Sequence, residues 1–225
     1  VTSALDRVER ERELRESERR FRLIADHIDE IVYLATADFS EIVYINDAYE
    51  EIYGRPVSEL AEDPTSFVKA AHPADRERYE ADVERLVADL EAGEPREAYG
   101  GEYRIERDGE TRWVAVTRFP VENEAGTVDR IVGRVQDVTE RKRREREYEQ
   151  IYNGVNDSIT VHDPETAELL DVNDTFCELL GHDREEILEM GIEGYSPTGE
   201  RFTMAQAREF VREVLDADEP QRTEW

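Results

Sequence analysis

Residues 46–54 are Asn-Asp-Ala-Tyr-Glu-Glu-Ile-Tyr-Gly, and residues 173–181, which lie 127 positions later, are Asn-Asp-Thr-Phe-Cys-Glu-Leu-Leu-Gly. The match extends without a gap over residues 21–60 and 148–187, and in this alignment most apolar residues of one stretch correspond to apolar residues of the other. Self-similarity at a fixed offset is the signature of a duplicated structural unit. The sequence therefore predicts two copies of one domain in succession.

Outward from this stretch, the apolar pattern of the first copy predicts two short strands, a long helix and three longer strands. The first strand is expected at residues 31–35 and the second ends at Asn46. Pro73 begins an amphipathic helix and Gly93 ends it. After Gly93 the apolar period changes to two residues, which is typical of strands. The three later strands are expected at residues 99–107, 111–121 and 127–137.

Three short motifs in this order of elements resemble those of the PAS domain family. Asn46-Asp47 followed by Tyr49 and Gly54 is similar to the family's Asn, aromatic and Gly stretch. His72-Pro73-x-Asp75 resembles the entry to its long helix, and residues 137–142, Asp-Val-Thr-Glu-Arg-Lys, resemble the PAC motif that closes its sheet. The resemblance implies an α+β fold: a five-stranded antiparallel sheet with flanking helices, enclosing a small cavity that senses ligands, redox state, light or partners.

The repeat and the charge pattern divide the chain into four segments. They are a charged, amphipathic N-terminal helix at residues 1–20, a complete PAS domain with its PAC motif at 21–138, a helical linker at 139–147, and a partial second PAS domain at 148–225. Glu224-Trp225 stand where the first copy has Glu102-Tyr103, so we expect the second copy to lack its last three strands. Two strands alone are rarely stable in water, which indicates a piece of a longer protein.

Acidic residues dominate the composition. The 225 residues include 57 Asp and Glu against 29 Lys and Arg, a net charge of −28, and only Lys69 and Lys142 are lysines. This charge repels phosphate backbones and anionic membranes, so we expect neither direct nucleic-acid binding nor membrane insertion. Acid-rich, lysine-poor composition is typical of salt-adapted proteins and predicts a cytoplasmic, haloarchaeal protein; the alternative is an acidic mesophilic protein from a G+C-rich genome.

The N-terminal segment carries opposite charges at helical spacing, such as Glu11 with Arg15 and Glu16 with Arg20. An apolar seam near heptad spacing accompanies these pairs and consists of Leu14, Phe21, Ile24 and Ile28. The pattern fits a dimerising coiled coil and a solvated surface helix equally well. We expect a homodimer through this helix.

The sequence holds little cofactor or catalytic chemistry. A single cysteine, Cys177, excludes an internal disulfide, and the four histidines lie too far apart for a local metal motif. The first copy has no cysteine for a flavin adduct, and its long helix has no histidine for haem. His72 precedes that helix, where we expect a capping or a solvated role. We find no phosphate loop and no nucleophile and base pair, so no enzyme activity is expected in these residues. We therefore expect neither a flavin adduct nor haem, and we expect any ligand to be small and non-covalent.

The resemblance implies a ligand cavity lined by apolar and aromatic residues of the first copy. The candidates are Val32, Leu34, Val43, Ile45, Tyr49, Ile52, Phe67, Tyr79, Val83, Leu86 and Trp113. Asp137, Thr139, Glu140 and Arg141 resemble the family's strand-to-helix signalling junction. We therefore expect an intracellular sensor whose signal passes through the linker helix to a downstream output domain. The alternatives are the input region of a histidine kinase or transcription regulator, and a structural homodimerisation unit with a dry core.

Overall fold

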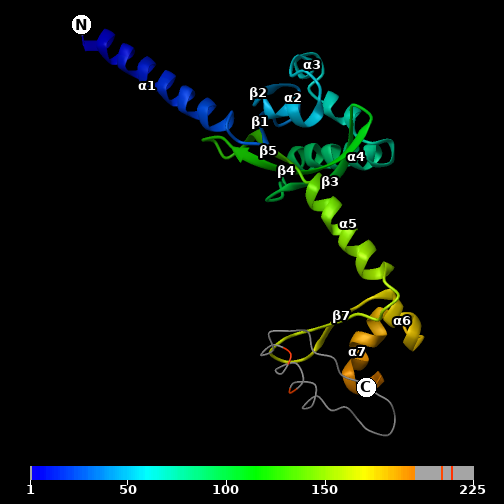
Figure 1. Ribbon diagram of the computed structural model, residues 1–225. Coiled ribbons are helices and arrows are strands. Elements are labelled where there is room, and N and C mark those ends of the chain that lie inside the picture. Colours follow the sequence, from blue (N-terminus) through cyan, green and yellow to red (C-terminus); the bar gives the residue numbers. More distant parts are fainter. Residues whose placement is uncertain (1, 196–208, 210–213, 215–225) are drawn as a thin grey trace. The chain divides into compact units, whose positions relative to one another are not determined.

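The computed structural model describes residues 2–195, Glu209 and Val214, and it divides into two compact units at residues 142 and 143 (Figure 1). The first unit begins with α1 (Thr2–Ala25). The boundary predicted after residue 20 therefore falls inside this helix. Phe21, Ile24 and Ile28 of the predicted seam are exposed. No helix in the described ranges has the length and apolar character needed to cross a membrane.

The first unit contains a five-stranded antiparallel sheet. Its strands are β1 (Ile31–Thr36), β2 (Ile42–Ile45), β3 (Tyr99–Arg107), β4 (Glu110–Glu122) and β5 (Val128–Asp137). They are ordered β2-β1-β5-β4-β3, so the last strand in the chain lies at the centre of the sheet. The predicted α+β architecture and the predicted strands are confirmed.

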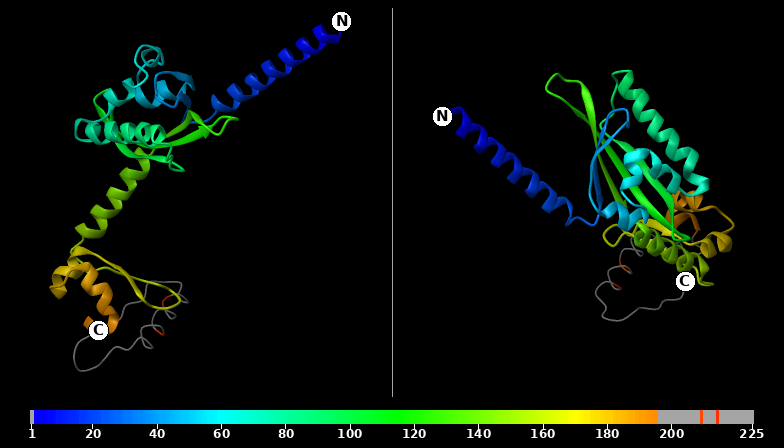
Figure 2. Two further views of the ribbon diagram at one scale, coloured as in Figure 1. Left: turned by 180° about the vertical axis from the view of Figure 1, so that it is seen from behind. Right: turned by 90° about the horizontal axis from the view of Figure 1, so that it is seen from above.

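Helices cover one face of this sheet (Figure 2). They are α2 (Ala48–Tyr53), α3 (Ser58–Glu62), the 3-10 helix η1 (Ser66–Ala70) and α4 (Pro73–Glu91). Pro73 occupies the first turn of α4, and the His72 side chain accepts a hydrogen bond from the Ala74 amide, as expected for a helix cap. The core forms between the sheet and these helices.

The alternation of β1 decides which residues face that core. Ile31, Tyr33 and Ala35 are buried, whereas Val32 and Leu34 are only half-buried on the other face. The pairing of β1 with β2 shifts between Leu34 and Ala35, so Val43 is an extra residue in β2 and is 46% exposed. Because the bulge restores the phase, Ile42 and Ile45 both face the core although they are three residues apart.

The second unit repeats the start of the first. Its elements are the greater part of α5 (Thr139–Gly154), then β6 (Thr160–His162), β7 (Leu169–Val172), α6 (Asp174–Leu180) and α7 (Arg184–Tyr195). The predicted linker at 139–147 is the first part of α5, which continues without a break into the second copy. The second copy is expected to lack its last three strands. That expectation rests on the residues up to Trp225, and residues 196–208, 210–213 and 215–225 lie outside the described ones.

Candidate functional site

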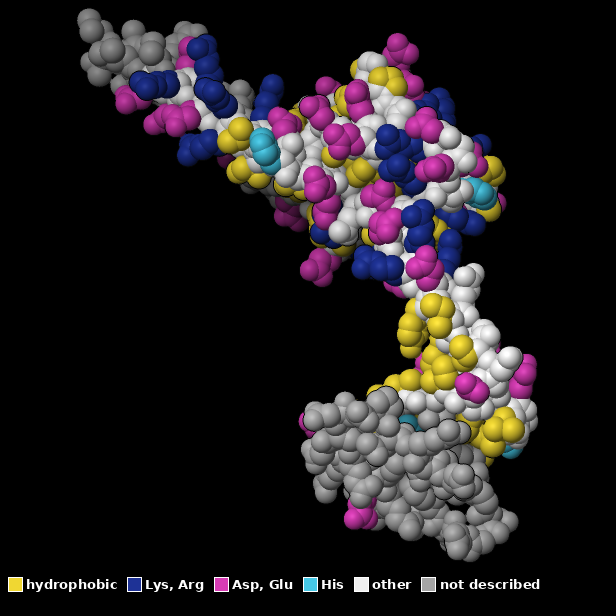
Figure 3. Space-filling model, viewed as in Figure 1, with side chains coloured by type: hydrophobic (Ala, Val, Ile, Leu, Met, Phe, Trp, Pro, Cys, Tyr) yellow, Lys and Arg dark blue, Asp and Glu magenta, His cyan; other side chains and the backbone are white. Residues whose placement is uncertain are grey.

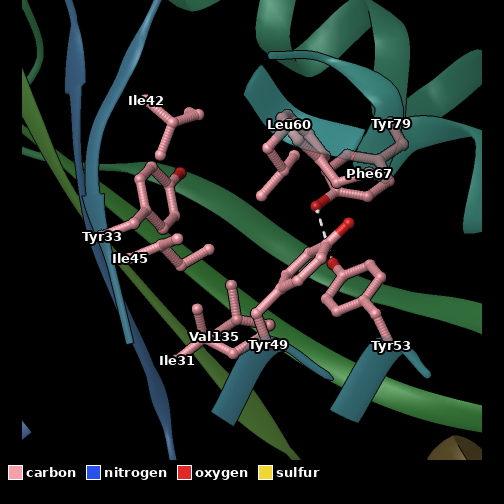
Figure 4. A pocket seen from close by; sticks show the side chains of 10 residues that line it. All are labelled: Ile31, Tyr33, Ile42, Ile45, Tyr49, Tyr53, Leu60, Phe67, Tyr79 and Val135. Carbon is pink, nitrogen blue, oxygen red and sulfur yellow. Dashed lines mark hydrogen bonds between the residues drawn. The ribbon is translucent and has the colours of Figure 1, made fainter. Parts of the chain in front are cut away.

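An apolar cavity lies between the sheet and the helices of the first unit (Figure 4). The lining residues are Ile31 and Tyr33 of β1, Ile42 and Ile45 of β2, Tyr49 and Tyr53 of α2, Leu60 of α3, Phe67 of η1, Tyr79 of α4 and Val135 of β5. Its volume is about 20 Å³, which is the space that a single water molecule requires. The cavity therefore has room only for a very small group unless side chains move.

Aromatic side chains form the helical wall of this cavity. The hydroxyl groups of Tyr53 and Tyr79 lie 3.3 Å apart, and the Tyr79 ring stacks on Tyr103 with 4.1 Å between ring centroids. Tyr103 in turn donates a hydrogen bond of 2.6 Å to Asp82. Burial raises the pKa of Tyr49 to about 12, so its phenol remains protonated at neutral pH.

An arginine lies beside the same tyrosines. Arg118 of β4 is fully buried, with 0% of its surface exposed, and its Nε donates to the Tyr33 hydroxyl over 3.2 Å. Arg118 pairs across the sheet with Gly133 of β5, and Gly133 pairs with Tyr33 of β1. A Cβ at Gly133 would lie 2.0 Å from the Tyr33 ring, so only glycine lets this ring cross β5 and reach the guanidinium.

The structure brings four of the eleven predicted pocket residues to the cavity: Ile45, Tyr49, Phe67 and Tyr79. Ile52, Val83 and Leu86 are buried in the core but do not line the cavity. Val32 and Leu34 do not line the cavity because they lie on the other face of β1. Val43 does not line it because it is the extra residue of the bulge in β2.

Trp113 is placed elsewhere, because it alternates with the inward-facing Val114 and so points to the opposite face of the sheet. Lys142 Nζ lies 5.5 Å from the centroid of its ring. The expectation that Trp113 lines the pocket was therefore wrong, because the inward-facing residue of β4 is its neighbour Val114.

Six lining residues were missed by the sequence reasoning: Ile31, Tyr33, Ile42, Tyr53, Leu60 and Val135. Arg118 was missed as well. The signal for Arg118 was present, because it alternates with Val114 and Val116 and therefore shares their buried face.

The predicted relay residues gather at the end of β5. Asp137 accepts a hydrogen bond of 2.9 Å from the Thr139 amide and contacts Arg112 over 3.4 Å. The Thr139 hydroxyl accepts a hydrogen bond of 2.9 Å from the Trp113 amide, and the Val138 amide donates to the Trp113 carbonyl. The start of α5 is thus hydrogen-bonded to β5 and to its neighbour β4.

A second set of contacts holds the first turn of α5 to the edge strand β3. Glu102 of β3 forms ion pairs with Arg141 and with Lys142, the latter over 2.8 Å. Hydrogen bonds from Lys142 and Arg141 lower the pKa of the Glu102 carboxyl, so the group is charged at neutral pH. Of the four predicted relay residues, Asp137, Thr139 and Arg141 make these junction contacts, and Glu140 lies exposed in the first turn of α5.

A buried asparagine ties the entering helix to the sheet. The Asn46 side chain donates to the carbonyls of Ala25 (2.8 Å) and Glu30 (2.9 Å) and accepts from the Val32 amide (3.0 Å). We call this arrangement the Asn46 clamp. It joins the last residue of α1 to the beginning of β1.

The second unit contains the same arrangement at an offset of 127 residues. Asn173 donates to the carbonyls of Tyr152 and Asp157, at 3.0 Å each, and accepts from the Ile159 amide over 2.9 Å. Gly54 and Gly181, which end α2 and α6, are both left-handed, with φ of 67° and 72°. The sequence repeat therefore corresponds to a repeated hydrogen-bond geometry.

Metal-ligating residues do not converge: among the described residues, no group of three or more His, Cys, Asp or Glu could hold an ion. Cys177 is half-buried on α6, and burial raises the pKa of its thiol. The residues around the cavity are apolar and phenolic, apart from Arg118 beside it.

Comparison with protein families agrees with this geometry. The profile of the PAS fold matches residues 42–135, and a profile of the PAS domain matches residues 146–215. The chain belongs to the PAS domain family. The first match contains the cavity-lining stretch from Ile42 to Val135, and the second contains Asn173 and its clamp.

Solved PAS structures resemble the chain over about half its length. A domain of a candidate light and redox sensing histidine kinase from Haloarcula marismortui is 35% identical, with 54% of this chain and 99% of that chain covered and a TM-score of 0.41. A sensory box histidine kinase/response regulator from Burkholderia thailandensis is 30% identical (57% and 91% covered, TM-score 0.41). The N-terminal domain of a diguanylate cyclase with a PAS/PAC sensor from Marinobacter aquaeolei is 23% identical (50% and 98%, TM-score 0.41). No curated protein matches the chain.

Proposed function

We propose that this chain is a sensory input region of a signal-transduction protein, in which the first PAS copy responds at its cavity and passes the response to α5. One observation carries the proposal. Val135 lines the cavity, Asp137 ends the same strand, and Thr139 begins α5. The cavity wall and the output helix are thus four residues apart on one continuous segment.

The hydrogen bonds of β5 support transmission along this segment. The strand pairs with β1 on one side and β4 on the other, so a displacement at Val135 must shift one of these ladders. Thr139 and Val138 then bind the Trp113 backbone of β4. If the junction between β5 and α5 exchanges between two states, a ligand shifts their populations only as far as it binds the two states with different affinity.

A cavity-filling substitution tests the proposal without a known ligand. Val135→Leu adds one methylene at the cavity wall, and Val132→Leu adds it on the opposite, 37% exposed face of the same strand. We expect Val135→Leu to change amide hydrogen exchange in the first two turns of α5 and Val132→Leu to leave it unchanged. Adding Thr139→Val, which removes the hydroxyl acceptor, should weaken the effect. Equal exchange in α5 for both leucine variants would refute the coupling.

The repeated clamp supports a second PAS copy after the first, and hence a tandem arrangement. We propose that an output domain follows in the longer protein, either a histidine kinase or a transcription regulator, and that any ligand is small and non-covalent. We also propose a cytoplasmic, salt-adapted protein, on the basis of its charge of −28. Acidic and basic side chains are interspersed over the face of the first unit shown in Figure 3.

A structural homodimerisation unit is the second candidate function, and the small volume of the cavity favours it. Phe21, Leu23 and Ile24 on α1 are each more than half exposed, which provides apolar surface for a partner helix. Substituting serine for Phe21, Leu23 and Ile24 should convert a dimer to a monomer in sedimentation. An unchanged mass would exclude this apolar surface of α1 as the dimer contact.

A further inference from the structure

The Arg118 guanidinium is a buried cation without a carboxylate. Its two terminal nitrogens, Nη1 and Nη2, are inaccessible to solvent and have no hydrogen-bond partner in the described part of the chain. Its Nε donates to the Tyr33 hydroxyl, and the Tyr79 phenol is the other polar group beside the guanidinium. An arginine stays charged at any physiological pH, and a buried charge without a counter-ion costs several kcal/mol.

The groups around Arg118 do not supply that counter-ion. The guanidinium carbon lies 5.3 Å from the centroid of the Tyr79 ring. The neighbouring polar groups are phenols. Burial raises the pKa of Tyr53, Tyr79 and Tyr103, so these three side chains are neutral at physiological pH. Asp82, on the same helix as Tyr79, is engaged by the Tyr103 hydroxyl and by Arg85. Among the described residues, none forms an ion pair with Arg118.

The position of Arg118 points to the cavity as the place from which an anion would reach it. Tyr33 and Tyr79 line the cavity (Figure 4). Both also contact the guanidinium, which therefore lies next to two residues of the cavity wall although Arg118 itself does not line it. Tyr49 is a lining residue, and its buried hydroxyl lies beside the buried hydroxyl of Ser66. Ligand pockets typically combine apolar walls with a few such polar groups.

We propose that Arg118 is the anchor for the carboxylate of a short organic acid, whose apolar part occupies the cavity. The proposal deepens the proposed sensory function and rests on it. Two free terminal nitrogens match the two oxygens of a carboxylate, a pairing that arginine makes in bidentate fashion. The walls offer isoleucine and aromatic carbon to an alkyl group, and because the cavity volume is about 20 Å³ these side chains must move apart to admit it. Neutral phenols complete the site as donors.

Thermal unfolding with matched probes tests this assignment. Potassium acetate and potassium butyrate are compared with acetamide and butyramide, which have the same shape without the charge, at constant potassium concentration. We expect a saturable rise of the unfolding midpoint with a carboxylate and none with the amides. Arg118→Met, which keeps the apolar stem, should abolish the rise. Stabilisation by amides, equal stabilisation of Arg118→Met, or no saturable effect of either carboxylate would overturn the proposal.

Two further measurements separate the possible outcomes. Potassium chloride at the same concentration tests an inorganic source, and stabilisation by chloride equal to that by butyrate would overturn the organic acid. The NMR resonance of the Arg118 Nε–H group should shift on titration with butyrate, a local readout that does not depend on whether Arg118→Met folds. If Val135→Leu alters α5 exchange while this resonance stays fixed, the carboxylate site is refuted and the sensory function stands. If neither responds, both fail.

Discussion

Removing the Asn46 clamp should weaken the first unit selectively. Asn46 makes three side-chain hydrogen bonds of 2.8–3.0 Å and is 1% exposed, so no water replaces them when the side chain is truncated. Each such bond contributes about 1 kcal/mol net, which gives a loss of about 3 kcal/mol for Asn46→Ala. This corresponds to roughly 100-fold faster exchange of those amides that exchange through unfolding of the unit.

The repeat provides a matched control for this measurement. Asn173→Ala removes the equivalent bonds from the second unit, together with the cap bond that Asn173 accepts from the Phe176 amide. It should accelerate exchange in β6 while leaving β1 unchanged, and Asn46→Ala should do the reverse. Hydrogen exchange with peptide resolution reports both strands in one experiment. A loss below about 0.5 kcal/mol in β1 after Asn46→Ala would refute the clamp as a source of stability.

Asn46→Asp adds a dependence on pH. The carboxylate can still accept from the Val32 amide, but it faces the Ala25 and Glu30 carbonyls, which are also acceptors. Burial and this repulsion favour the protonated acid and raise its folded-state pKa above the unfolded value of about 3.9. Relative to the wild type, the variant should therefore be most stable below about pH 4 and lose stability as the pH rises through the folded-state pKa. A variant as stable as the wild type at pH 7 would refute the argument.

Three other expectations follow from the first unit and the composition. Gly133→Ala places a Cβ 2.0 Å from the Tyr33 ring, so it should cost about 1–3 kcal/mol in urea unfolding; a neutral effect would mean that the ring moves freely. Hydrogen bonds from Arg104 lower the pKa of Asp75 to about 2, so this pair stabilises the fold above the unfolded pKa and loses about 2 kcal/mol as the pH falls from about 4 toward 2. Asp75→Asn should flatten the unfolding free energy over that window, and an unchanged slope would contradict the assignment. The net charge of −28 predicts a melting temperature that rises from about 0.1 M to 2 M KCl, and a flat curve would contradict salt adaptation.

The strand phase limited the prediction of the candidate site. A period of two identifies a strand but leaves open which of its faces the helices cover, and the choice of Val32 and Leu34 over Ile31 and Tyr33 was off by one residue. The bulge at Val43 reverses the phase again within β2. The sequence of a strand alone shows neither which of its faces is covered nor where a bulge occurs, because both depend on the elements that pack and pair with it.

Arg118 shows the same limit for a polar residue. A charged residue in an exposed-looking strand is ordinarily assigned to the solvated face, because charged side chains are rarely buried. Alternation places Arg118 on the face of Val114 and Val116, but the contacts that hold a guanidinium there follow only from the register that aligns Arg118 with Gly133 and Tyr33. The glycine is the physical reason for the arrangement, since any side chain there would exclude the Tyr33 ring.

The repeat, the order of strands and of the long helix in the first copy, and the asparagine shared by both copies follow from the sequence alone, because local periodicity and turn residues encode these features directly. The hydrogen bonds that make each asparagine a clamp were seen only in the structure. Asp137 and Thr139 were also found from the sequence, through the resemblance of residues 137–142 to the PAC motif. Their contacts with Arg112 and Trp113 join residues far apart in the chain and follow only from the tertiary structure. The lining of the cavity, the displacement of Trp113 to the outer face and the burial of Arg118 were decided only by tertiary structure. They depend on strand order, register and the face that α2 and α4 cover, and each of these is a relation between segments that no single segment specifies.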